Sequence, residues 1–265
     1  MMRQLFEPLY EWILEGQIRY IPSHVAIIQD GNRRYAISQG ILRDDGHRMG
    51  ADRTEEMLEW TRSLGITHVT LYSFSTENFH RDSAEVHALF DLFKERFTRV
   101  LDDPRIHRNR VRVQMIGERT LLPDDLRAII EQAEEATAGY DAYFLNIAIA
   151  YGGRNEIVRA ARAILQNVRD GEYAVGDIDR ALVEQHICSD HNLPPVDLVI
   201  RTGNEYRTSN FLPWLANGHE SAVCFCAPYW PLFRKIDFLR ALRIYSQRRE
   251  VLAGPPVSII RSRIA

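Results

Sequence analysis

Residues 24–35 read His24-Val25-Ala26-Ile27-Ile28-Gln29-Asp30-Gly31-Asn32-Arg33-Arg34-Tyr35, an apolar run followed at once by polar side chains. A short, continuous apolar run is typical of a strand buried on both faces of a parallel sheet. Open α/β sheets bind ligands beyond the carboxyl ends of such strands. Asp30 can hold a divalent cation there, and Gly31 lets backbone N–H groups approach an anion closely. Arg33 and Arg34 can pair with phosphate oxygens, so metal, phosphate and apolar surface are expected together.

Further apolar runs repeat this pattern along the chain and alternate with helical periodicity. The predicted strands cover 24–28, 67–74, 111–116, 143–150, 196–200 and 222–226. The predicted helices cover about 47–64, 83–101, 123–138, 155–168, 179–188 and 237–251. This alternation predicts a single α/β domain over residues 1–265, with a central, mostly parallel six-stranded sheet and helices on both faces. An extra helix is expected at about 1–15, and a tail at about 252–265.

The composition of the chain argues against nucleic-acid-binding, membrane-spanning and secreted proteins. The net charge is −3 over 265 residues, whereas proteins that bind nucleic acid usually carry a basic surplus. No apolar run approaches the ~20 residues that cross a bilayer, and Met1–Tyr20 lacks the apolar core of a secretory signal. Three cysteines favour a reducing compartment, and Cys224 and Cys226 are expected to be buried thiols in a strand. A cytoplasmic protein that does not bind nucleic acid is therefore expected.

The helix that begins at about Ser83 has the clearest periodicity. Asp82 or Ser83 can cap it, and Glu85 stands three residues after Asp82, as in a capping box. A broad apolar stripe follows, made of Val86, Leu89, Phe90, Phe93, Phe97, Val100 and Leu101. The stripe fits an ordinary core-facing helix, and it also fits a helix that partly lines an apolar tunnel. Periodicity does not separate the two interpretations.

Two later strands also end in polar loops. Ser75 to Arg81 offers hydroxyl, amide and guanidinium groups beside Phe79, although a solvated loop explains this stretch about as well. Arg201 ends another apolar run, and Arg207 and Ser209 follow it around a turn. Such a loop can bind an anion, but paired surface arginines are a common alternative. Two arginine-bearing loops at strand ends indicate two anionic substrates, or one substrate with two phosphate ends.

Taken together and in order, these stretches resemble the cis-prenyltransferase family, also called the undecaprenyl or dehydrodolichyl diphosphate synthase family. The matching pieces are His24-Val25-Ala26-Ile27-Ile28-x-Asp30-Gly31-Asn32-x-Arg34, Gly46-His47-x-x-Gly50, Leu71-Tyr72-x-Phe74-Ser75-Thr76-Glu77-Asn78, Asn146-Ile147-Ala148 with Tyr151-Gly152-Gly153-Arg154, Asp197-Leu198-Val199-Ile200-Arg201-Thr202-Gly203 with Arg207-x-Ser209-Asn210-Phe211-Leu212, and Trp230-Pro231. They cover about residues 20–245, and the ordered set is far more specific than any single piece.

The resemblance implies an enzyme that condenses isopentenyl diphosphate onto an allylic diphosphate, such as farnesyl or geranylgeranyl diphosphate. The product would be a Z-polyprenyl diphosphate, a precursor of a glycan-carrier lipid. It further implies Mg²⁺ as cofactor, a homodimer, and peripheral membrane contact for product release. The product would grow in an apolar tunnel, for which the helix at 83–101 and the strand at 143–150 are the expected walls.

The resemblance also assigns site residues. It implies that Asp30 coordinates Mg²⁺ and is required for chemistry, with Glu220 reaching the metal site from the other subunit. Asn78 matches a position often assigned as proton acceptor; since a neutral amide is a poor base, it is expected to position a water or phosphate oxygen. The expected substrate-binding residues are Gly31, Asn32, Arg33, Arg34, Tyr35, Arg43, His47, Ser75, Thr76, Glu77, Phe79, Arg81, Arg201, Arg207, Thr208 and Ser209.

The sequence departs from the family pattern around these sites. Arg33 stands where many bacterial members have Gly, and Asn204 replaces a second Gly in the Arg201 loop. Tyr35 and Phe79 replace frequent tryptophans. Arg33 and Asn204 leave one alternative open, in which the same scaffold transfers the allylic group to a different acceptor. A second alternative is a noncatalytic partner subunit; such subunits typically lose the Asp or the C-terminal arginines, whereas Asp30, Arg201 and Arg207 are present here. Paired DDxxD motifs, which trans-prenyl synthases use, are absent from the sequence.

Overall fold

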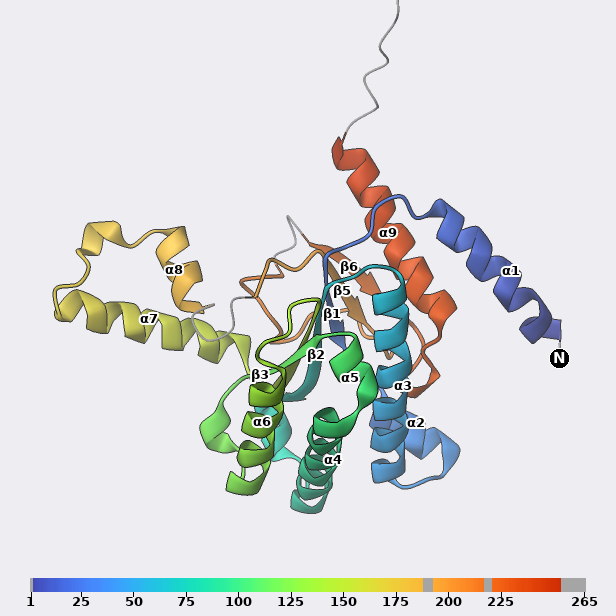
Figure 1. The fold of residues 1–265 in the computed structure, drawn as a ribbon, viewed down its shortest axis with the longest axis horizontal. Helices are drawn as coiled ribbons and strands as arrows, with labels where there is room; N and C mark the ends of the chain where they lie inside the picture. Colours follow the sequence, from blue (N-terminus) through green and yellow to red (C-terminus); the bar gives the residue numbers. More distant parts are fainter. Residues whose placement is uncertain (1, 188–192, 217–220, 254–265) are drawn as a thin grey trace, which may run out of the picture.

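The computed structural model describes residues 2–187, 193–216 and 221–253. Its centre is a six-stranded sheet in the order β3-β4-β2-β1-β5-β6, shown in Figure 1. The strands are β1 (His24–Ile28), β2 (His68–Ser75), β3 (Val111–Ile116), β4 (Tyr143–Tyr151), β5 (Leu198–Arg201) and β6 (Ala222–Phe225). Every strand pairing is parallel, so the predicted α/β domain with six strands is confirmed, with a sheet that is wholly rather than mostly parallel.

The helices connect these strands. They are α1 (Met2–Gln17), α2 (Asn32–Gln39), α3 (Arg43–Ser63), α4 (Ser83–Asp102), α5 (Pro104–Arg108), α6 (Asp124–Thr137), α7 (Gly153–Arg169), α8 (Arg180–Ile187) and α9 (Lys235–Ala253), with short 3-10 turns η1 (Thr76–His80), η2 (Arg119–Leu121), η3 (Val175–Asp177) and η4 (Trp230–Leu232). The sequence analysis did not predict α2 or α5. Most of the expected tail, 254–265, lies outside the described residues. None of the described helices is long and apolar enough to cross a bilayer.

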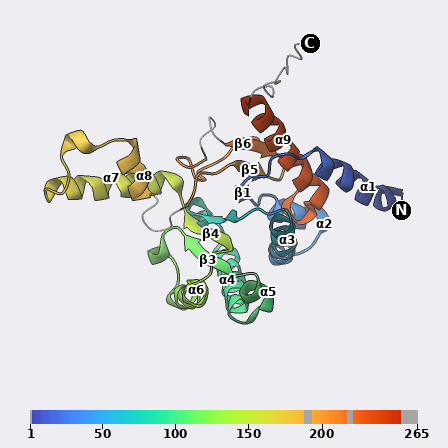
Figure 2. The same ribbon diagram turned by 45° about the horizontal axis from the view of Figure 1, so that its top comes forward.

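The two faces of the sheet are covered unequally. Val25 and Ile27 of β1 point into a large core shared with α3, α4, α6 and α9. Ala26 and Ile28 point to the opposite face, where a smaller core includes Phe211. Figure 2 shows α3, α4, α5 and α6 together on one side of the strands, while α7 and α8 project away. The large core contains most of the described helices that pack on the sheet, and the smaller core on the other face is covered in part by the loop that contains Phe211.

The order of the strands creates a crevice next to β1. The chain leaves β1 towards β2 on one side, while β5 pairs with β1 on the other. Connections that diverge from neighbouring parallel strands open a crevice at their carboxyl ends, where α/β proteins bind ligands. In register, Ile28 stands opposite both Tyr72 of β2 and Arg201 of β5. The three polar loops predicted from sequence therefore begin at one edge of the sheet.

The expectation for the cysteines of β6 is met in part. Cys224 is buried, Cys226 at the end of the strand is half-buried, and both are free thiols. Their Sγ atoms are 3.8 Å apart because alternate residues of a strand face the same side. Cys188 lies outside the described residues.

Candidate active site

Asp30 lies at the centre of the crevice. Its Oδ1 accepts a hydrogen bond from Nη2 of Arg34 at 3.0 Å, and its Oδ2 accepts one from Nη2 of Arg201 at 2.7 Å. The backbone of Asp30 is fixed as well, because its N–H donates to Oγ1 of Thr202 at 3.0 Å and its C=O accepts from the Thr202 hydroxyl at 2.7 Å. About a quarter of the Asp30 side chain remains exposed. The carboxylate is therefore held firmly and stays open to a ligand.

Gly31 directly precedes α2, and its position leaves no space for a side chain. Its φ of 111° lies in the left-handed region, and a Cβ atom at this position would lie 2.7 Å from Cδ1 of Tyr229. The backbone then turns directly into α2, whose first N–H groups have no acceptor within the helix. These N–H groups and the helix dipole favour an anion beside Asp30. The sequence analysis expected a loop at this point, so the structure adds a helix N-terminus to the predicted phosphate site.

The Arg201 loop is the second of the two anion sites predicted from the sequence. The Arg201 side chain is only 4% exposed, and its Nη1 donates to Oγ of Ser209 at 2.6 Å and to the C=O of Arg207 at 2.8 Å. Asn204 has a φ of 55°. Asparagine tolerates this left-handed conformation better than most residues, so it can replace the glycine of the family pattern without changing the turn. The hydrogen bonds to Arg207 and Ser209 thus fix the orientation of the Arg201 guanidinium group.

Glu205, which was not predicted from the sequence, links Arg34 of α2 to Arg207 of the Arg201 loop. Its Oε1 accepts from Nη1 of Arg34 at 3.2 Å, while its Oε2 pairs with Nη1 of Arg207. Arg34 also lies over the ring of Tyr229, with 5.4 Å between its Cζ and the ring centroid. A carboxylate that holds one arginine from each loop is in the position where a substrate phosphate could take its place.

Glu85 is a second carboxylate near the crevice whose contacts were not predicted from the sequence. It was expected as part of a capping box, but Asp82 alone caps α4, accepting from the N–H groups of residues 84 and 85. The Glu85 carboxylate is 4% exposed and instead faces a group of basic side chains. These contacts are with Arg33 at 3.4 Å, Arg43 at 3.4 Å, His47 at 3.4 Å and Arg81 at 3.1 Å. Sequence spacing gave no signal of this cluster, because its members come from α2, α3 and the segment before α4.

Burial lowers the pKa of His47, and the positive charge of Arg81 lowers it further. Hydrogen bonding to Glu85 opposes both effects. α3 begins at Arg43, four residues earlier than predicted. Arg43 and His47 therefore lie one helical turn apart on the same helix. Both side chains therefore face Glu85, and a neutral His47 can serve as a hydrogen-bond donor among fixed positive charges.

The loop after β2 closes the site from the side. The N–H of Ser75 donates to Oδ1 of Asn78 at 3.1 Å, which ties η1 into a tight turn. The exposed Glu77 accepts from Asn210 at 3.0 Å and so connects this loop to the Arg201 loop. Phe79 packs edge-on against Phe74, with ring centroids 5.0 Å apart. The amide oxygen of Asn78 is thus already engaged, whereas its NH₂ group is a donor.

The remaining predicted residues are placed as follows. Tyr35 is buried in α2, Thr76 lies against Gly152 at the start of α7, and Thr208 is half-buried beside Ser209. Glu220 lies outside the described residues. The structure therefore gathers the described charged residues of the prediction around one crevice, while Tyr35 faces the protein interior.

A cavity of about 210 Å³ opens next to this crevice. Asn32 and His47 line its near end, and Asn109 and Tyr143 line its far end. Its walls are mainly apolar and include, from α4, Leu89, Leu92, Phe93, Phe97 and Val100, and, from β4, Leu145 and Ile147. Both expected tunnel walls, the helix at 83–101 and the strand at 143–150, thus contribute to one apolar cavity.

The oxygen atoms near the crevice fit a hard divalent cation. The Asp30 carboxylate supplies these oxygen atoms, whereas Oδ1 of Asn32, which is buried without a hydrogen-bond partner, lies against Gly50 of α3. Within the described ranges, no group of three or more His, Cys, Asp or Glu side chains is placed to hold a metal. Mg²⁺ nevertheless binds through one or two carboxylates together with substrate phosphates, so a single Asp beside a diphosphate site is sufficient.

The chain is similar to known proteins over most of its length. A family model described as "Putative undecaprenyl diphosphate synthase" matches residues 28–252. Tritrans,polycis-undecaprenyl-diphosphate synthase (geranylgeranyl-diphosphate specific) of Halobacterium salinarum is 46% identical over 260 residues, covering 96% of this chain and 85% of the relative. The protein of the same name from Methanocaldococcus jannaschii is 48% identical over 244 residues, covering 91% and 86%.

A solved structure is also similar. The crystal structure of lavandulyl diphosphate synthase from Lavandula x intermedia, in complex with dimethylallyl diphosphate, aligns with a TM-score of 0.80 and 33% identity. The alignment covers 85% of this chain and 95% of that one.

Proposed function

Because the chain belongs to the undecaprenyl diphosphate synthase family, whose members are prenyltransferases that elongate allylic diphosphates with isopentenyl diphosphate, we propose that Asp30 and Arg201 organise this reaction here. The observation that carries the proposal is the pairing of one carboxylate with both arginine loops. Asp30 contacts Arg34 through one oxygen and Arg201 through the other. Two diphosphates bound at these loops would meet at Asp30.

The allylic diphosphate is proposed to bind at the N-terminus of α2. Arg34 and the Glu85-bound arginines surround this point, and fixed guanidinium groups match phosphate oxygens well. Isopentenyl diphosphate is proposed to bind at the second loop, where Arg201, Arg207 and Ser209 already contact one another. As the allylic C–O bond breaks, negative charge grows on the leaving diphosphate, and these positive charges favour that state most.

Mg²⁺ is the proposed cofactor, with Asp30 as its ligand from this chain and Glu220 as a proposed ligand from the partner subunit. When bound, the ion would supply further positive charge to the leaving diphosphate. Arg34 and Arg201 hold the two oxygens of Asp30 at fixed positions, so the carboxylate is oriented before a ligand arrives.

Asn78 is proposed to position rather than to accept the proton. Condensation forms one C–C bond, breaks the allylic C–O bond and releases one proton from isopentenyl diphosphate. Since the Asn78 amide oxygen already accepts from Ser75, its NH₂ group is the part left to donate. It can hold a phosphate oxygen or a water, and that oxygen takes the proton.

The apolar cavity is proposed to hold the growing chain. It begins at Asn32 and His47, beside the proposed allylic site, and its walls are mainly hydrocarbon. Removal of each added five-carbon unit from water favours this location. Since the archaeal relatives are named geranylgeranyl-diphosphate specific, geranylgeranyl diphosphate is the proposed primer and a Z-polyprenyl diphosphate the proposed product.

A homodimer is proposed through α7 and α8. These helices project from the domain in Figure 1; α7 carries the exposed apolar side chains Val158 and Leu165, and the turn η3 between the two helices carries the exposed Val175. An apolar arm that leaves its own domain can bury these side chains against a second copy. Sedimentation equilibrium should give a dimer for the wild type, and Leu165→Glu should shift it towards monomer.

A cytoplasmic protein with peripheral membrane contact is also proposed. Phe6, Leu9 and Trp12 of α1 are more than half exposed, and aromatic side chains of this kind favour the membrane interface. Flotation with phosphatidylglycerol vesicles should carry the wild-type protein upward, and Trp12→Ser should reduce the floated fraction. Equal flotation would contradict this role of α1.

The reaction is tested by incubating the protein with Mg²⁺, labelled isopentenyl diphosphate and each of several allylic primers. Mass-resolved products should form a ladder of five-carbon steps, and Asp30→Ala should abolish it. The absence of elongated product with every primer would overturn the proposal. A single product without the ladder would instead support transfer to another acceptor.

A further inference from the structure

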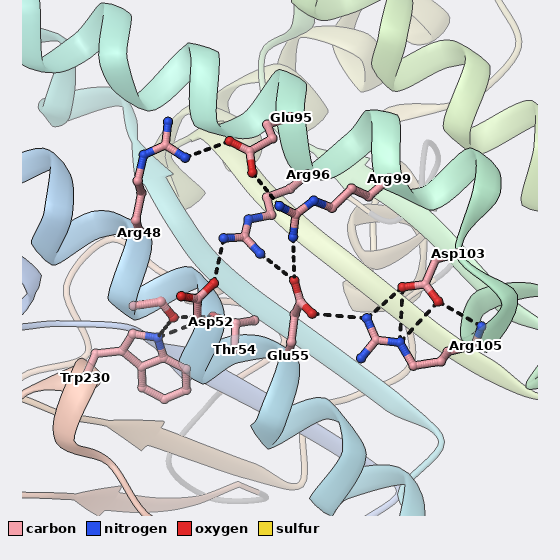
Figure 3. Close-up of polar contacts among 11 residues, drawn as sticks. Arg48, Asp52, Thr54, Glu55, Glu95, Arg96, Arg99, Asp103, Arg105 and Trp230 are labelled. Carbon is pink, nitrogen blue, oxygen red and sulfur yellow. Dashed lines mark hydrogen bonds and ion pairs between the residues drawn. The ribbon is translucent and has the colours of Figure 1, made fainter.

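A row of ion pairs closes the outer side of the apolar cavity. It joins α3 to α4 and α5, as Figure 3 shows, and we call it the ionic seam. Its members are Arg48, Asp52, Glu55, Glu95, Arg96, Arg99, Asp103 and Arg105. None of these residues belongs to the diphosphate crevice described above.

Glu55 is the centre of the ionic seam. It comes from α3 and pairs with Arg96 of α4, with Arg99 at 3.5 Å and with Arg105 at 3.1 Å. Arg96 also reaches Asp52, one turn earlier on α3, at 2.7 Å. Every one of these pairs crosses from α3 to the opposite helices, so Glu55 connects the two sides of the cavity.

The ionic seam is part of the cavity wall. Glu55, Arg96 and Arg105 line the same space as the apolar residues of α4. The lining on α3 runs from His47 to Arg62, which corresponds to about 22 Å along the helix axis. The seam lies between these two points, so a chain that grows away from the diphosphate site passes beneath it.

The ion pairs of the ionic seam are also weak enough to separate. The side chains of Glu55 and Arg105 are 35% and 53% exposed, and ion pairs this exposed to water are weak and are screened by salt. Nε of Arg96 is buried without an acceptor, and such an unpaired group destabilises the closed arrangement. By contrast, the cavity floor consists of sheet strands, which are fixed by their hydrogen bonds.

We propose that the ionic seam is a lateral gate that sets product length. The growing chain stays in the cavity while the seam is closed, and extension beyond the cavity requires α3 to separate from α4 at Glu55. The gate therefore limits length, and weakening it should give longer products. This inference rests on the proposed prenyl elongation.

The test compares product lengths of Glu55→Gln with those of the wild type. Glu56→Gln is the matched control, because Glu56 is the next residue and, among the described residues, its ion pair is with Arg53 of the same helix. Glu55→Gln should lengthen the main product by at least one five-carbon unit, and Glu56→Gln should leave it unchanged. Raising the salt concentration should lengthen the wild-type product in the same direction and should have less effect on Glu55→Gln.

Arg105→Met is a second variant. It should disturb folding less than Glu55→Gln, since Arg105 lies at the surface. It removes one bond to Glu55 and should give a smaller shift in the same direction. Unchanged product lengths in both folded variants, while the rate of isopentenyl incorporation remains normal, would overturn the gate. The absence of incorporation in the wild type would instead contradict the proposed function, so the two failures are distinct.

Discussion

Oδ2 of Asp30 accepts a hydrogen bond from Nη2 of Arg201 at 2.7 Å, although the two residues are 171 positions apart in the chain. Parallel pairing of β1 with β5 brings them together, because Ile28 and Arg201 are register partners. The other nitrogen of the Arg201 fork contacts Ser209. One guanidinium group thus fixes both the proposed metal ligand and the proposed isopentenyl diphosphate loop.

Arg201→Lys should therefore be far from conservative. An ammonium group keeps the charge but lacks the planar fork that reaches Asp30 and the Ser209 loop together. We expect kcat/KM for isopentenyl diphosphate to fall about 100-fold, which corresponds to about 2.7 kcal/mol. Steady-state kinetics would measure this, with Arg127→Lys, a surface arginine paired with Asp124, as the control. Equal kinetics for the two variants would show that the fork has no such role.

Gly31→Ala should abolish most activity because two effects coincide. The φ of 111° is strained for any L-residue, and the added Cβ would lie 2.9 Å from Cα of Tyr229, which is backbone and cannot rotate away. Gly40 at the other end of α2 has a φ of 66° and nothing within 4 Å of its Cβ position. Gly40→Ala should thus cost only about 1–2 kcal/mol of stability.

Turnover and thermal unfolding of both alanine variants would check this prediction. Gly31→Ala should lose at least about 100-fold in turnover, as expected when a site moves by a fraction of an ångström to 1 Å. Gly40→Ala should retain turnover near the wild-type rate. Similar losses in both variants would mean that backbone strain alone matters and that Tyr229 does not hold the start of α2.

Much of this arrangement could be predicted from the sequence. The strands are continuous apolar runs, and the polar residues that follow them must meet at one edge of a parallel sheet. On this basis Asp30 and Arg34 were predicted at one strand end and Arg201 at another, and the family resemblance joined them in one site; the structure places Arg34 and Arg201 each against Asp30. The proline after Asp103, at the first position of α5, is a recognisable helix start, yet α5 was missed because it has only five residues.

Other features depend on tertiary contacts that spacing does not encode. α2 is short, and its polar residues show no apolar periodicity, so the pattern after Gly31 was interpreted as a loop. Glu85 fitted a capping box, but its carboxylate instead pairs with Arg33 and Arg43, which are remote in sequence, and with Arg81, which lies four residues earlier. Likewise, Glu55 and Arg96 belong to different helices, and only packing shows that they close a cavity.

Glu85→Gln should weaken binding of the allylic diphosphate. Its carboxylate holds Arg33, Arg43 and Arg81 together, and without it these guanidinium groups repel one another and move apart. We expect KM for the allylic diphosphate to rise about tenfold, or about 1.4 kcal/mol, while KM for isopentenyl diphosphate stays nearly constant. The pKa of His47 should also fall, since Glu85 raises it in the wild type.

Substrate-specific kinetics and NMR titration of His47 would measure the two effects separately. Asp91→Asn is the control, because Asp91 is on the same helix and pairs at the surface with Lys94. A lower KM in Glu85→Gln would contradict the prediction and would mean that Glu85 only competes with the substrate for the arginines.

His24 should make the fold sensitive to acid. Its Nδ1 lies 2.9 Å from the C=O of Pro194, so this nitrogen carries the proton, and Nε2 accepts from the Thr70 hydroxyl at 2.7 Å. Burial lowers the pKa of His24 to about 4, and the positive charge of a protonated His68 also disfavours its charged form, whereas Asp197 opposes this. Both ring nitrogens are hydrogen-bonded in the neutral state, and burial is the main cause that disfavours the charged form.

The sign of the effect follows from proton binding. Between pH 6.5, the ordinary value, and about 4, the unfolded chain binds a proton at His24 that the folded chain does not bind. Stability is therefore full above pH 6.5 and falls as the pH drops towards 4, by about 3 kcal/mol in total. Urea unfolding at several pH values should show this slope in the wild type and in the exposed-residue control His80→Asn. It should be shallower in His24→Asn, and a slope equal to that of the wild type would assign the acid sensitivity to other groups.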